Sequence, residues 1–595
     1  MTYDQIASVS VLGLALVLFA WGKLRYDIVA LSALLAGIIL GVVPGGQAFV
    51  GFGHPAVITV AAVLILSRGL GESGATQIIA DALAPLFKSR FAHIAGLSSV
   101  AAALSGFMNN VGALALLMPV AVQSAADAKR SPSLLLMPLA YGSILGGLLT
   151  LIGTPPNIIV ATYRDQALGE PFYMFDFMPV GFVVAVAGLL FVALIGWRLI
   201  PIRRPVSGDA ASAYGMEDYL AEVRVVEGSQ AIGLTVRKLD PLIGDFDVKV
   251  VGLIRGDRVF PAAPRFARLE QDDILLIEAA PGGLQDVVAA LGVELIDPTA
   301  PRTSLLHSED VELVEAVVAE GSRLANRTVM AARLQRRYGV NLLAVSRQGQ
   351  PHRGRLRNFR FAAGDVLLLQ GEGERLTDVI SELGCMPLAA RGLKSFGGKR
   401  RGPILAVGFF AGAIALAALG VLPIAVALTG AALAMVFSGI LHARQLYESV
   451  NWSILVLLGA LIPLGSALEA SGATALAANA IAEFAVDLPP WAVLTLILVV
   501  TMTVSDILNN AATAVVMAPL AANVAAALGN NPDPYLMAVA VGASCAFLTP
   551  IGHQNNTLVM GPGGYRFGDY WRMGLPLEVI IVIVAIPAIM FFWPL

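Results

Sequence analysis

Two short polar stretches stand about 400 residues apart inside apolar sequence, at Ser105–Asn110 and Ser505–Asn510. Each begins with a serine, ends with an Asn-Asn pair, and is followed by an apolar run that contains a proline. Hydroxyl and amide oxygens are ligands that a hard cation such as Na⁺ accepts. Two matched stretches of this kind therefore predict one site that is built from two halves of the chain.

Two further stretches, Gly153–Asn157 and Gly552–Asn556, interrupt apolar runs with Gly, Pro and amide residues. Such breaks leave backbone carbonyls without a helical partner, and these carbonyls suit a cation. They also expose amides at helix N-termini, and these amides suit an anion. Pairing each Asn-Asn stretch with one break predicts two sodium sites. Their predicted ligands are Ser105, Asn109, Asn110 and the Gly153 backbone, and Ser505, Asn509, Asn510 and the Gly552 backbone. The alternative is that these side chains only cap helix ends, and the double match makes that interpretation the weaker one.

The composition places most of the chain in lipid. The 595 residues are 57% hydrophobic and only 14% charged, whereas soluble proteins carry about 25% charged residues. The net charge of −3 gives no argument for nucleic acid binding. Cys385 and Cys545 have no Cys or His neighbour at metal-binding spacing, so neither a disulfide framework nor a transition-metal site is expected. The sequence also shows no nucleophile–base pair, which argues against an enzyme, and no P-loop, which argues against ATP-driven transport.

A membrane-spanning helix needs about 20 apolar residues, and the sequence predicts five spans in each half. They are 5–21, 27–44, 55–71, 133–151 (continuing past a break to about 163) and 176–198, then 402–420, 422–441, 452–470, 534–562 and 574–595. The run 91–125 is predicted to form a re-entrant hairpin, because its second arm of about 13 residues is too short to cross. The run 490–527 is its counterpart, and residues 72–90 are predicted to form an amphipathic interfacial helix.

Residues 201–400 are rich in charge and lack long apolar runs, which predicts a soluble insert. The insert contains its own repeat, because Asp273–Ile277 recurs as Asp365–Leu369 and Leu291-Gly292 recurs as Leu383-Gly384. Short β-branched runs that alternate with helical patterns favour two small α/β modules. The predicted domains are a first membrane repeat at 1–200, modules at 215–298 and 305–388, and a second membrane repeat at 401–595.

The distribution of basic residues predicts the orientation in the membrane. Five crossings per half place the N-terminus and the insert on opposite sides, so the two repeats are inverted. Basic residues collect on the side of the insert, whereas the opposite side carries mainly acidic residues. The positive-inside rule then makes the insert cytoplasmic and leaves both termini outside the plasma (inner) membrane. The first hairpin enters from the inside and the second from the outside.

The hairpin pattern, the break Gly153–Asn157, and the stretch Thr549–Asn556 with its continuation Gly561–Phe567 resemble the divalent anion:sodium symporters. More narrowly, they resemble the branch with two TrkA-C (RCK_C) domains in the central loop, which includes sodium/sulfate transporters. The resemblance spans nearly the whole chain. It implies a homodimer that works as an elevator, with sodium at both hairpin sites, the anion between the tips, and cytoplasmic domains that regulate transport through an unidentified ligand. The substrate-binding residues that it implies are Asn109, Asn110, Val111, Gly112, Thr154, Asn509, Asn510, Ala511, His553, Gln554 and Asn556.

The chain departs from the dicarboxylate members of that family, which carry Ser-Asn-Thr at both tips. Here Asn109–Val111 and Asn509–Ala511 lack both hydroxyls, and His553–Asn556 replaces the second Pro-Pro break. Amide donors and a histidine suit a small tetrahedral oxyanion, so a sodium/sulfate symporter is the leading hypothesis. The alternatives are a sodium/dicarboxylate symporter and an RCK-gated ion channel, although the TVGYG filter of potassium channels is absent.

Two ionisable residues lie next to the predicted sites. His553 has two interpretations that stay open: it donates to the anion or makes transport sensitive to pH, or it only hydrogen-bonds a carbonyl of the broken helix. Asp506 either assists the second cation site or carries a proton, or it is a solvated carboxylate in the mouth of the hairpin. The solvated carboxylate is the favoured expectation.

Overall fold

The structure of the chain is a computed structural model. It describes residues 1–21, 24–74, 89–201, 220–243, 248–255, 258–260, 266–279, 287–288, 290–295, 311–319, 322–347, 350–352, 356, 359–390, 401–476, 478, 488–508 and 510–595. The chain divides into two compact units, Met1–Arg204 with Lys394–Leu595 and Pro205–Leu393. Asn509 and most of the predicted interfacial helix lie outside the described residues.

The first unit is helical, and its two halves contain similar helices in the same order. The first half has α1 (Tyr3–Trp21), α2 (Tyr26–Ile39), α3 (Pro55–Glu72), α5 (Arg90–Ser105), α6 (Asn110–Asp127), α7 (Ser133–Gly146), α8 (Pro155–Leu168) and α9 (Met178–Leu194). The second half has α16 (Arg401–Ala418), α17 (Ile424–Phe437), α18 (Ala443–Glu448), α19 (Trp452–Ala470), α21 (Pro490–Ile507), α22 (Asn510–Ala527), α23 (Pro532–Ser544), α24 (Gln554–Gly563) and α25 (Tyr570–Phe592). Short 3₁₀ helices are η1 (Gly45–Gln47), η2 (Val50–Gly53), η4 (Gly147–Leu149), η5 (Gly196–Leu199) and η10 (Phe567–Asp569).

Six helical segments among the described residues are long and apolar enough to cross a membrane. They are Gly45–Glu72, Asn110–Asp127, Trp452–Ala470, Pro490–Ile507, Asn510–Ala527 and Phe567–Phe592. Several shorter apolar helices, among them α2, α7, α9 and α17, accompany them. The helical unit is therefore that of a multi-span membrane protein, and the predicted polytopic helical class is confirmed.

The prediction that the second arm of the first hairpin is too short to cross the membrane is wrong. α5 has 16 residues and α6 has 18, so the second arm is long enough to cross a membrane by length and composition. α6 is longer than predicted because it begins directly at Asn110, where the Asn109 side chain caps it, and continues to Asp127. The re-entrant course of the two hairpins stays a prediction, and it now rests on the burial of their tips rather than on arm length.

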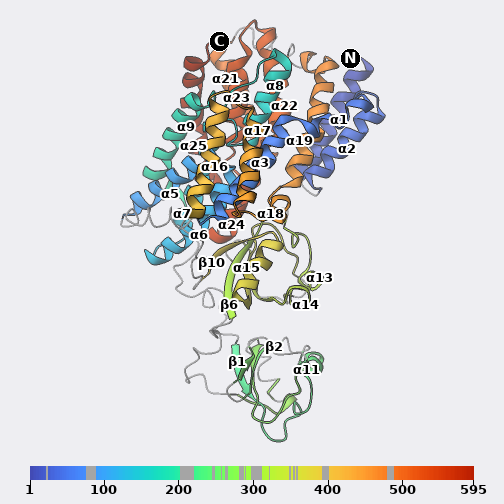
Figure 1. Cartoon of the computed structure of the whole chain (residues 1–595), viewed down its shortest axis with the longest axis vertical. Coiled ribbons are helices and arrows are strands. Elements are labelled where there is room, and N and C mark those ends of the chain that lie inside the picture. Colours follow the sequence, from blue (N-terminus) through green and yellow to red (C-terminus); the bar gives the residue numbers. More distant parts are fainter. Residues whose placement is uncertain are drawn as a thin grey trace. The chain divides into compact units, whose positions relative to one another are not determined.

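After each break, the next helix packs against helices of the other half of the chain. α7 packs on the first hairpin, α5 and α6, whereas α8, which follows it, packs on α22 and α23. In the same way α23 packs on α21 and α22, whereas α24 packs on α6 and α7. In Figure 1 α8 accordingly lies near α22 in the upper part of this unit, and α24 lies near α6 in the lower part. The two breaks are thus the places where the halves meet.

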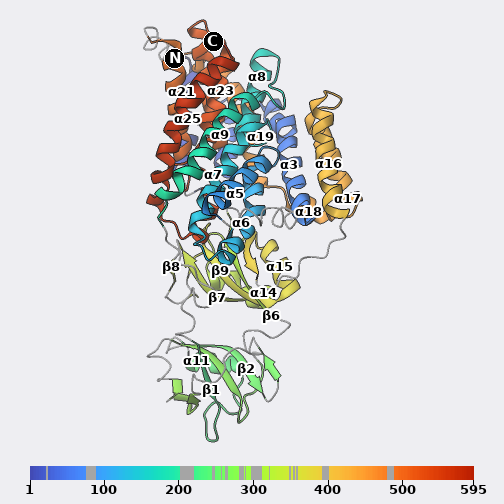
Figure 2. The same ribbon diagram turned by 90° about the vertical axis from the view of Figure 1, so that its left-hand side faces the viewer.

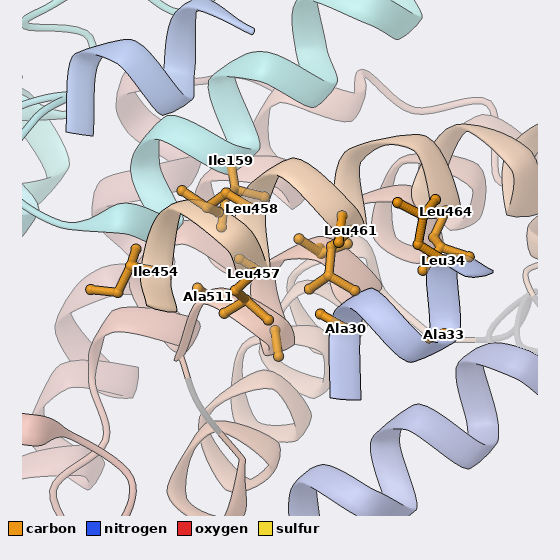
Figure 3. Packing of buried hydrophobic residues seen from close by; sticks show 14 of the residues in the cluster. Ala30, Ala33, Leu34, Ile159, Ile454, Leu457, Leu458, Leu461, Leu464 and Ala511 are labelled. Atoms are coloured by element: carbon orange, nitrogen blue, oxygen red, sulfur yellow. The ribbon is translucent and has the colours of Figure 1, made fainter. Parts of the chain in front are cut away.

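α19 lies at the centre of an apolar cluster that joins helices from both halves. In Figure 3 Leu457 of α19 lies on the side of Ala511 of α22, and Leu461 of α19 lies on the side of Ala30 of α2. Ile159 of α8 belongs to the same cluster. Small side chains at such a contact let helices approach closely, so packing rather than polar bonding holds them together. A second cluster joins α3 to the pair α16 and α17, which Figure 2 shows side by side next to α3.

The described residues of the second unit form two five-stranded sheets, and every strand pair in them is antiparallel. The first sheet, in the order β3-β2-β4-β1-β5, has β1 (Leu220–Arg224), β2 (Val248–Arg255), β3 (Arg258–Phe260), β4 (Ile274–Ala279) and β5 (Glu294–Leu295), with helix α11 (Val236–Ile243). The second, in the order β10-β6-β9-β7-β8, has β6 (Val311–Val318), β7 (Asn341–Arg347), β8 (Gln350–Pro351), β9 (Val366–Glu372) and β10 (Cys385–Ala390), with α13 (Val329–Ala332), α14 (Leu334–Tyr338) and α15 (Gly373–Glu382). Equivalent strands have the same neighbours in both sheets.

The internal repeat of the insert also appears in its side-chain contacts. Arg255 donates from Nε and Nη2 to the carboxylate of Asp273, at 2.8 and 2.6 Å. Arg347 donates in the same way to Asp365, at 2.7 Å for both bonds. The modules are therefore duplicates, but because all their described strand pairs are antiparallel they are α+β rather than the predicted α/β.

Candidate functional site

The first tip lies where α5 ends at Ser105 and α6 begins at Asn110. The Asn109 side chain accepts the backbone N–H of Val111 at 2.9 Å and so caps α6. The hydroxyl of Ser105 lies 2.9 Å from the side-chain oxygen position of Asn110, and both residues are buried. Three of the predicted residues are therefore together at this tip, and their polar atoms are removed from bulk solvent.

The second tip has a similar course with different hydrogen bonds. α21 ends at Ile507 and α22 begins at Asn510, which is half-buried. Ser505 is fully buried, and its hydroxyl donates to the backbone carbonyl of Ala543 on α23 at 2.6 Å. The side-chain oxygen of Asn510 accepts the N–H of Ala511 at 2.8 Å. Ser505 thus bonds to a neighbouring helix, whereas Ser105 bonds within its own tip.

At both breaks, one asparagine side chain hydrogen-bonds two backbone carbonyls of the broken helix. Asn157 Nδ2 donates to the carbonyls of Gly147 and Thr150, at 3.3 and 2.9 Å. Asn556 Nδ2 donates to the equivalent carbonyls of Ala546 and Thr549, at 3.1 and 3.0 Å. Carbonyls that lose their helical partner at a break need another donor, because an unpaired buried carbonyl is costly. One asparagine supplies that donor in each half.

Each break also contacts the tip of its own half. The hydroxyl of Thr150 donates to the carbonyl of Gly106, and that of Thr549 donates to the carbonyl of Asp506 at 2.8 Å. Gly552 approaches the second tip so closely that a Cβ there would lie 2.9 Å from the Asp506 Cα. A side chain at Gly552 therefore has no space. These contacts bring together the two pairs, tip and break, from which the sodium sites were predicted.

Contacts between the halves converge on Asn110. Its side chain lies 3.0 Å from Nε2 of His553, and its backbone carbonyl accepts Nδ2 of Asn555 at 3.1 Å. Asn555 Nδ2 also donates to the hydroxyl of Ser143 on α7 at 2.6 Å. The first tip and the second break therefore share one buried hydrogen-bond network. Asn555 and Ser143 were missed by the sequence prediction, because only three-dimensional contact assigns them to the site.

The network determines the tautomer of His553 and the orientation of Asn110. His553 Nδ1 accepts the backbone N–H of Asn555 at 3.1 Å, so a neutral ring carries its proton on Nε2. The Asn110 atom that faces Nε2 must then accept, and this orients the amide with its oxygen toward His553 and its NH₂ toward Ser105. His553 is buried, and its ring contacts the Asn110 side chain and the backbone N–H of Asn555 rather than a carbonyl of the broken helix.

Several buried oxygens around the breaks accept no hydrogen bond from the described residues. They are Thr154 Oγ1 and Asn157 Oδ1 at the first break, and Asn555 Oδ1 and Asn556 Oδ1 at the second. Unpaired buried acceptors are rare in proteins, because each carries the cost of its lost hydration. Such oxygens suit a bound cation, which would satisfy them as ligands.

Helix N-termini also gather at the tips and breaks. α6 and α24 begin at the contact between Asn110 and His553, and α8 packs on α22, which begins at the second tip. Each N-terminus presents free amides and a partial positive charge, which favours an anion. Among the predicted substrate-binding residues, Val111, Gly112 and Gln554 lie half-buried in first turns, whereas Ala511 packs in the apolar cluster around α19.

The expectation of a solvated Asp506 is wrong. Its side chain is only 4% exposed, because α21 carries it against the segment that follows α23. Asp506 Oδ1 accepts the N–H of Leu548 at 3.0 Å, and Glu578 on α25 accepts the N–H of the preceding Phe547 at 3.1 Å. Two carboxyl groups therefore bind adjacent amides freed by the second break. Glu578 was missed, although a lone acidic residue in the predicted span 574–595 was an available signal.

A partly open pocket lies at another place in the helical unit. It is lined mainly by apolar residues of α19, α8 and α22, among them Leu458, Ile159 and Val515. Tyr163 and Glu469 also line it, and the Tyr163 hydroxyl donates to Glu469 Oε1 at 3.2 Å. Its lining includes none of the tip asparagines, so the pocket is distinct from the candidate site.

A multi-span helical unit with two broken helices and two polar tips is the design of a secondary membrane transporter. The sequence model of the family described as "Citrate transporter" matches residues 16–542. The chain belongs to this family of transporters. The predicted membership of the divalent anion:sodium symporter type, and the prediction that the chain is not an enzyme, are thereby confirmed.

Individual relatives extend the similarity over the full length. The chain is 33% identical over 589 residues to the "Uncharacterized transporter sll0640" of Synechocystis sp., which covers 98% of this chain and 96% of the relative. It is 28% identical to the "Uncharacterized transporter YfbS" of Escherichia coli, with both chains covered completely. It is 25% identical over 394 residues to the "Sodium/sulfate cotransporter 1" of Chlamydomonas reinhardtii, over 62% of this chain and 44% of the relative.

Proposed function

We propose that the protein is a sodium-coupled symporter that imports a small divalent oxyanion, with sulfate favoured. The observation that supports it best is the meeting of the first tip and the second break, from opposite halves of the chain, in the buried network around Asn110. It combines oxygens that suit cations with helix N-termini that suit an anion. Binding both ions at one place lets a sodium gradient drive the uptake of a divalent anion.

Sodium as the coupling ion is supported by the chemical type of the buried oxygens that accept no hydrogen bond from the described residues. The unpaired buried atoms at the breaks are hydroxyl and amide oxygens, such as Thr154 Oγ1 and Asn157 Oδ1. Hard monovalent and divalent cations bind such ligands, whereas the softer transition metals prefer His and Cys. No cluster of His, Cys, Asp and Glu that could hold a metal occurs among the described residues. A relative named as a sodium/sulfate cotransporter gives the same indication.

Sulfate as the transported anion is supported by the N–H donors at the tips. Asn110 and the helix N-termini offer N–H groups in a compact network, and no Lys or Arg side chain is among these residues. A small tetrahedral oxyanion matches several converging N–H groups, whereas an elongated dicarboxylate needs a longer pocket. The second candidate is nevertheless a sodium-coupled carboxylate carrier, because the description of the matching family names citrate.

The proposed movement is an elevator in which the tips and broken helices slide against α19 and its neighbours. The contact between these two groups of helices is apolar and contains many alanines, as Figure 3 shows around Ala30, Ala33 and Ala511. Such a surface slides without breaking many directional bonds. The opposite placement of α5–α7 and α21–α23 in Figure 1 supports the proposal that the two repeats are inverted.

The unit of residues 205–393 is proposed to be regulatory. Its duplicated modules are proposed to be RCK_C domains on the cytoplasmic side, with an unidentified ligand, and the whole chain to form a homodimer in the plasma membrane with both termini outside. The support is the duplication itself, seen in the matched pairs Arg255–Asp273 and Arg347–Asp365, together with the distribution of basic residues.

The test is uptake of labelled sulfate by proteoliposomes that contain the purified protein. We expect uptake that requires an inward Na⁺ gradient and falls to the rate of empty liposomes when Na⁺ is replaced by choline. Excess unlabelled sulfate should compete fully, whereas succinate and citrate should compete weakly. Sulfate exchange that is indifferent to Na⁺ would contradict the coupling, and stronger competition by citrate would favour the carboxylate carrier.

A further inference from the structure

Asn555 occupies a position at which the two halves of the chain differ. The first break carries Pro156 at the equivalent place, and the asparagine that follows, Asn157 or Asn556, bonds the freed carbonyls in both halves. The opening of the broken helix therefore does not require the Asn555 side chain. This side chain is nevertheless completely buried, which is costly for an amide unless it makes specific bonds.

Among the described residues, both side-chain hydrogen bonds of Asn555 lead to the other half of the chain. Its Nδ2 donates to the Asn110 carbonyl at 3.1 Å and to the Ser143 hydroxyl at 2.6 Å. Ser143 donates its own proton to the carbonyl of Ala140 at 2.8 Å, so its oxygen is free to accept. One amide group thereby connects α24 to the start of α6 and to the last turn of α7.

Asn555 reaches Asn110 by a second route as well. Its backbone N–H fixes the tautomer of His553, and the ring then donates from Nε2 to the Asn110 side chain. The backbone carbonyl and the side chain of Asn110 are thus both held from the second break. Because Asn110 is a proposed ligand of the first cation site, its position depends on α24.

We propose that Asn555 is a positioning residue that couples the first cation site to the broken helix of the second half. The inference rests on the proposed function. It adds Asn555 to the residues of the site and couples the second break to the first tip. When Asn555 holds Asn110 in place, cation binding at the first tip and anion binding at the α24 N-terminus favour the same arrangement. Such coupling is reciprocal, so losing it must weaken both affinities by the same factor.

The test uses Asn555→Ala, which removes Nδ2 but keeps the N–H that orients His553. In sodium-dependent sulfate uptake we expect the half-saturating Na⁺ and sulfate concentrations each to rise about tenfold, since two buried hydrogen bonds are lost. The rate at saturation should stay within about twofold. The stabilisation of the detergent-solubilised protein by Na⁺ and sulfate, followed by thermal shift, should weaken in parallel.

Two further variants keep the inference falsifiable. Ser143→Ala removes one of the two acceptors and should raise both half-saturating concentrations about threefold, with a non-additive effect when it is combined with Asn555→Ala. Asn523→Ala is the matched control, because Asn523 Nδ2 donates to Pro519 within α22, and it should leave both concentrations unchanged.

The outcomes separate this inference from the proposed function. Wild-type uptake that depends on Na⁺, together with unchanged half-saturating concentrations in Asn555→Ala, would overturn the inference alone. Weaker stabilisation by only one of the two ions in the thermal-shift measurement would also overturn it, because equilibrium coupling affects both binding free energies. If the wild type shows neither sodium-dependent uptake nor stabilisation by Na⁺, the proposed function fails, and the inference fails with it.

Discussion

Asn157 and Asn556 occupy equivalent positions in the two halves of the chain, and each bridges two backbone carbonyls of its own broken helix. Both side chains are buried, at 1% and 0% exposure. The same residue therefore serves the same purpose about 400 residues apart. We expect Asn157→Ala and Asn556→Ala each to destabilise the helical unit by about 1–3 kcal/mol, because two buried carbonyls lose their donor. Thermal unfolding in detergent measures this, and a clearly unequal pair of shifts would contradict the equivalence.

The two tips should respond differently to mutation. Asn110 is 2% exposed and bonds across to the other half, whereas Asn510 is half-buried and, within the described residues, bonds to the N–H of Ala511 at its own helix start. Asn110→Ala is expected to lower sodium-dependent sulfate uptake at least tenfold, and Asn510→Ala about threefold. Initial uptake rates in proteoliposomes, normalised to the amount of reconstituted protein, provide the measurement. Wild-type rates in both variants would refute the assignment of the tips.

The bond between Tyr163 and Glu469 connects α8 to α19 across the proposed sliding contact. If α8 moves past α19 in each transport cycle, this bond must break each time. Tyr163→Phe is therefore expected to raise the maximal uptake rate by about two- to tenfold, since a typical hydrogen bond contributes about 0.5–1.5 kcal/mol. Tyr447→Phe, at an exposed position of α18, is the control. A fall in rate, or an equal rise in the control, would argue against the interpretation.

The buried carboxylates of the duplicated modules provide a matched pair of variants. Asp365 is 1% exposed and accepts both Arg347 nitrogens and the N–H of Ala362 at 2.7 Å. Asp365→Ala is expected to destabilise its module by about 1–3 kcal/mol, because these donors lose a buried acceptor. Asp273→Ala should do the same in the first module. Limited proteolysis should then cut the mutated module first, and loss of the helical unit instead would contradict the prediction.

The thiol of Cys385 should be unreactive at ordinary pH. Burial raises its pKa to about 12, so the reactive thiolate forms only when the pH approaches that value. In a Cys545→Ser background, a maleimide polymer is expected to label Cys385 neither at pH 7 nor at pH 9 unless the protein is unfolded. A gel shift measures the labelling, and the unfolded sample is the positive control. Complete labelling of the folded protein at pH 7 would contradict the buried position.

Much of the helical architecture could be predicted from sequence, because long apolar runs and their Gly and Pro interruptions are local signals. The span 452–470 coincides with α19, and the breaks at Gly153 and Gly552 separate helices where expected. Helix ends were predicted less well. The first hairpin shows why, since the cap formed by Asn109 extends α6 beyond the apolar run that was used to measure it.

The site was predictable only in part. The tips and breaks could be predicted because each occurs in both halves of the sequence. Asn555 and Ser143 belong to the site through contacts between the halves, which no local sequence pattern encodes. The environment of Asp506 was predicted incorrectly for the same reason, since its burial is due to the segment after α23 and to α25. The sheets of the insert were assigned the wrong class, because short strands and helices alternate along the sequence without forming parallel crossovers.

The difference between Pro156 and Asn555 has a kinetic consequence. A carrier made of two equivalent inverted halves would look the same from either side of the membrane, and its influx and efflux would have equal half-saturation values. Here one half carries an inflexible proline pair and the other an amide that holds the opposite tip. The inward-facing and outward-facing forms then differ in energy, so the carrier should act as a partial rectifier, with different substrate affinities on its two faces but the same equilibrium gradient.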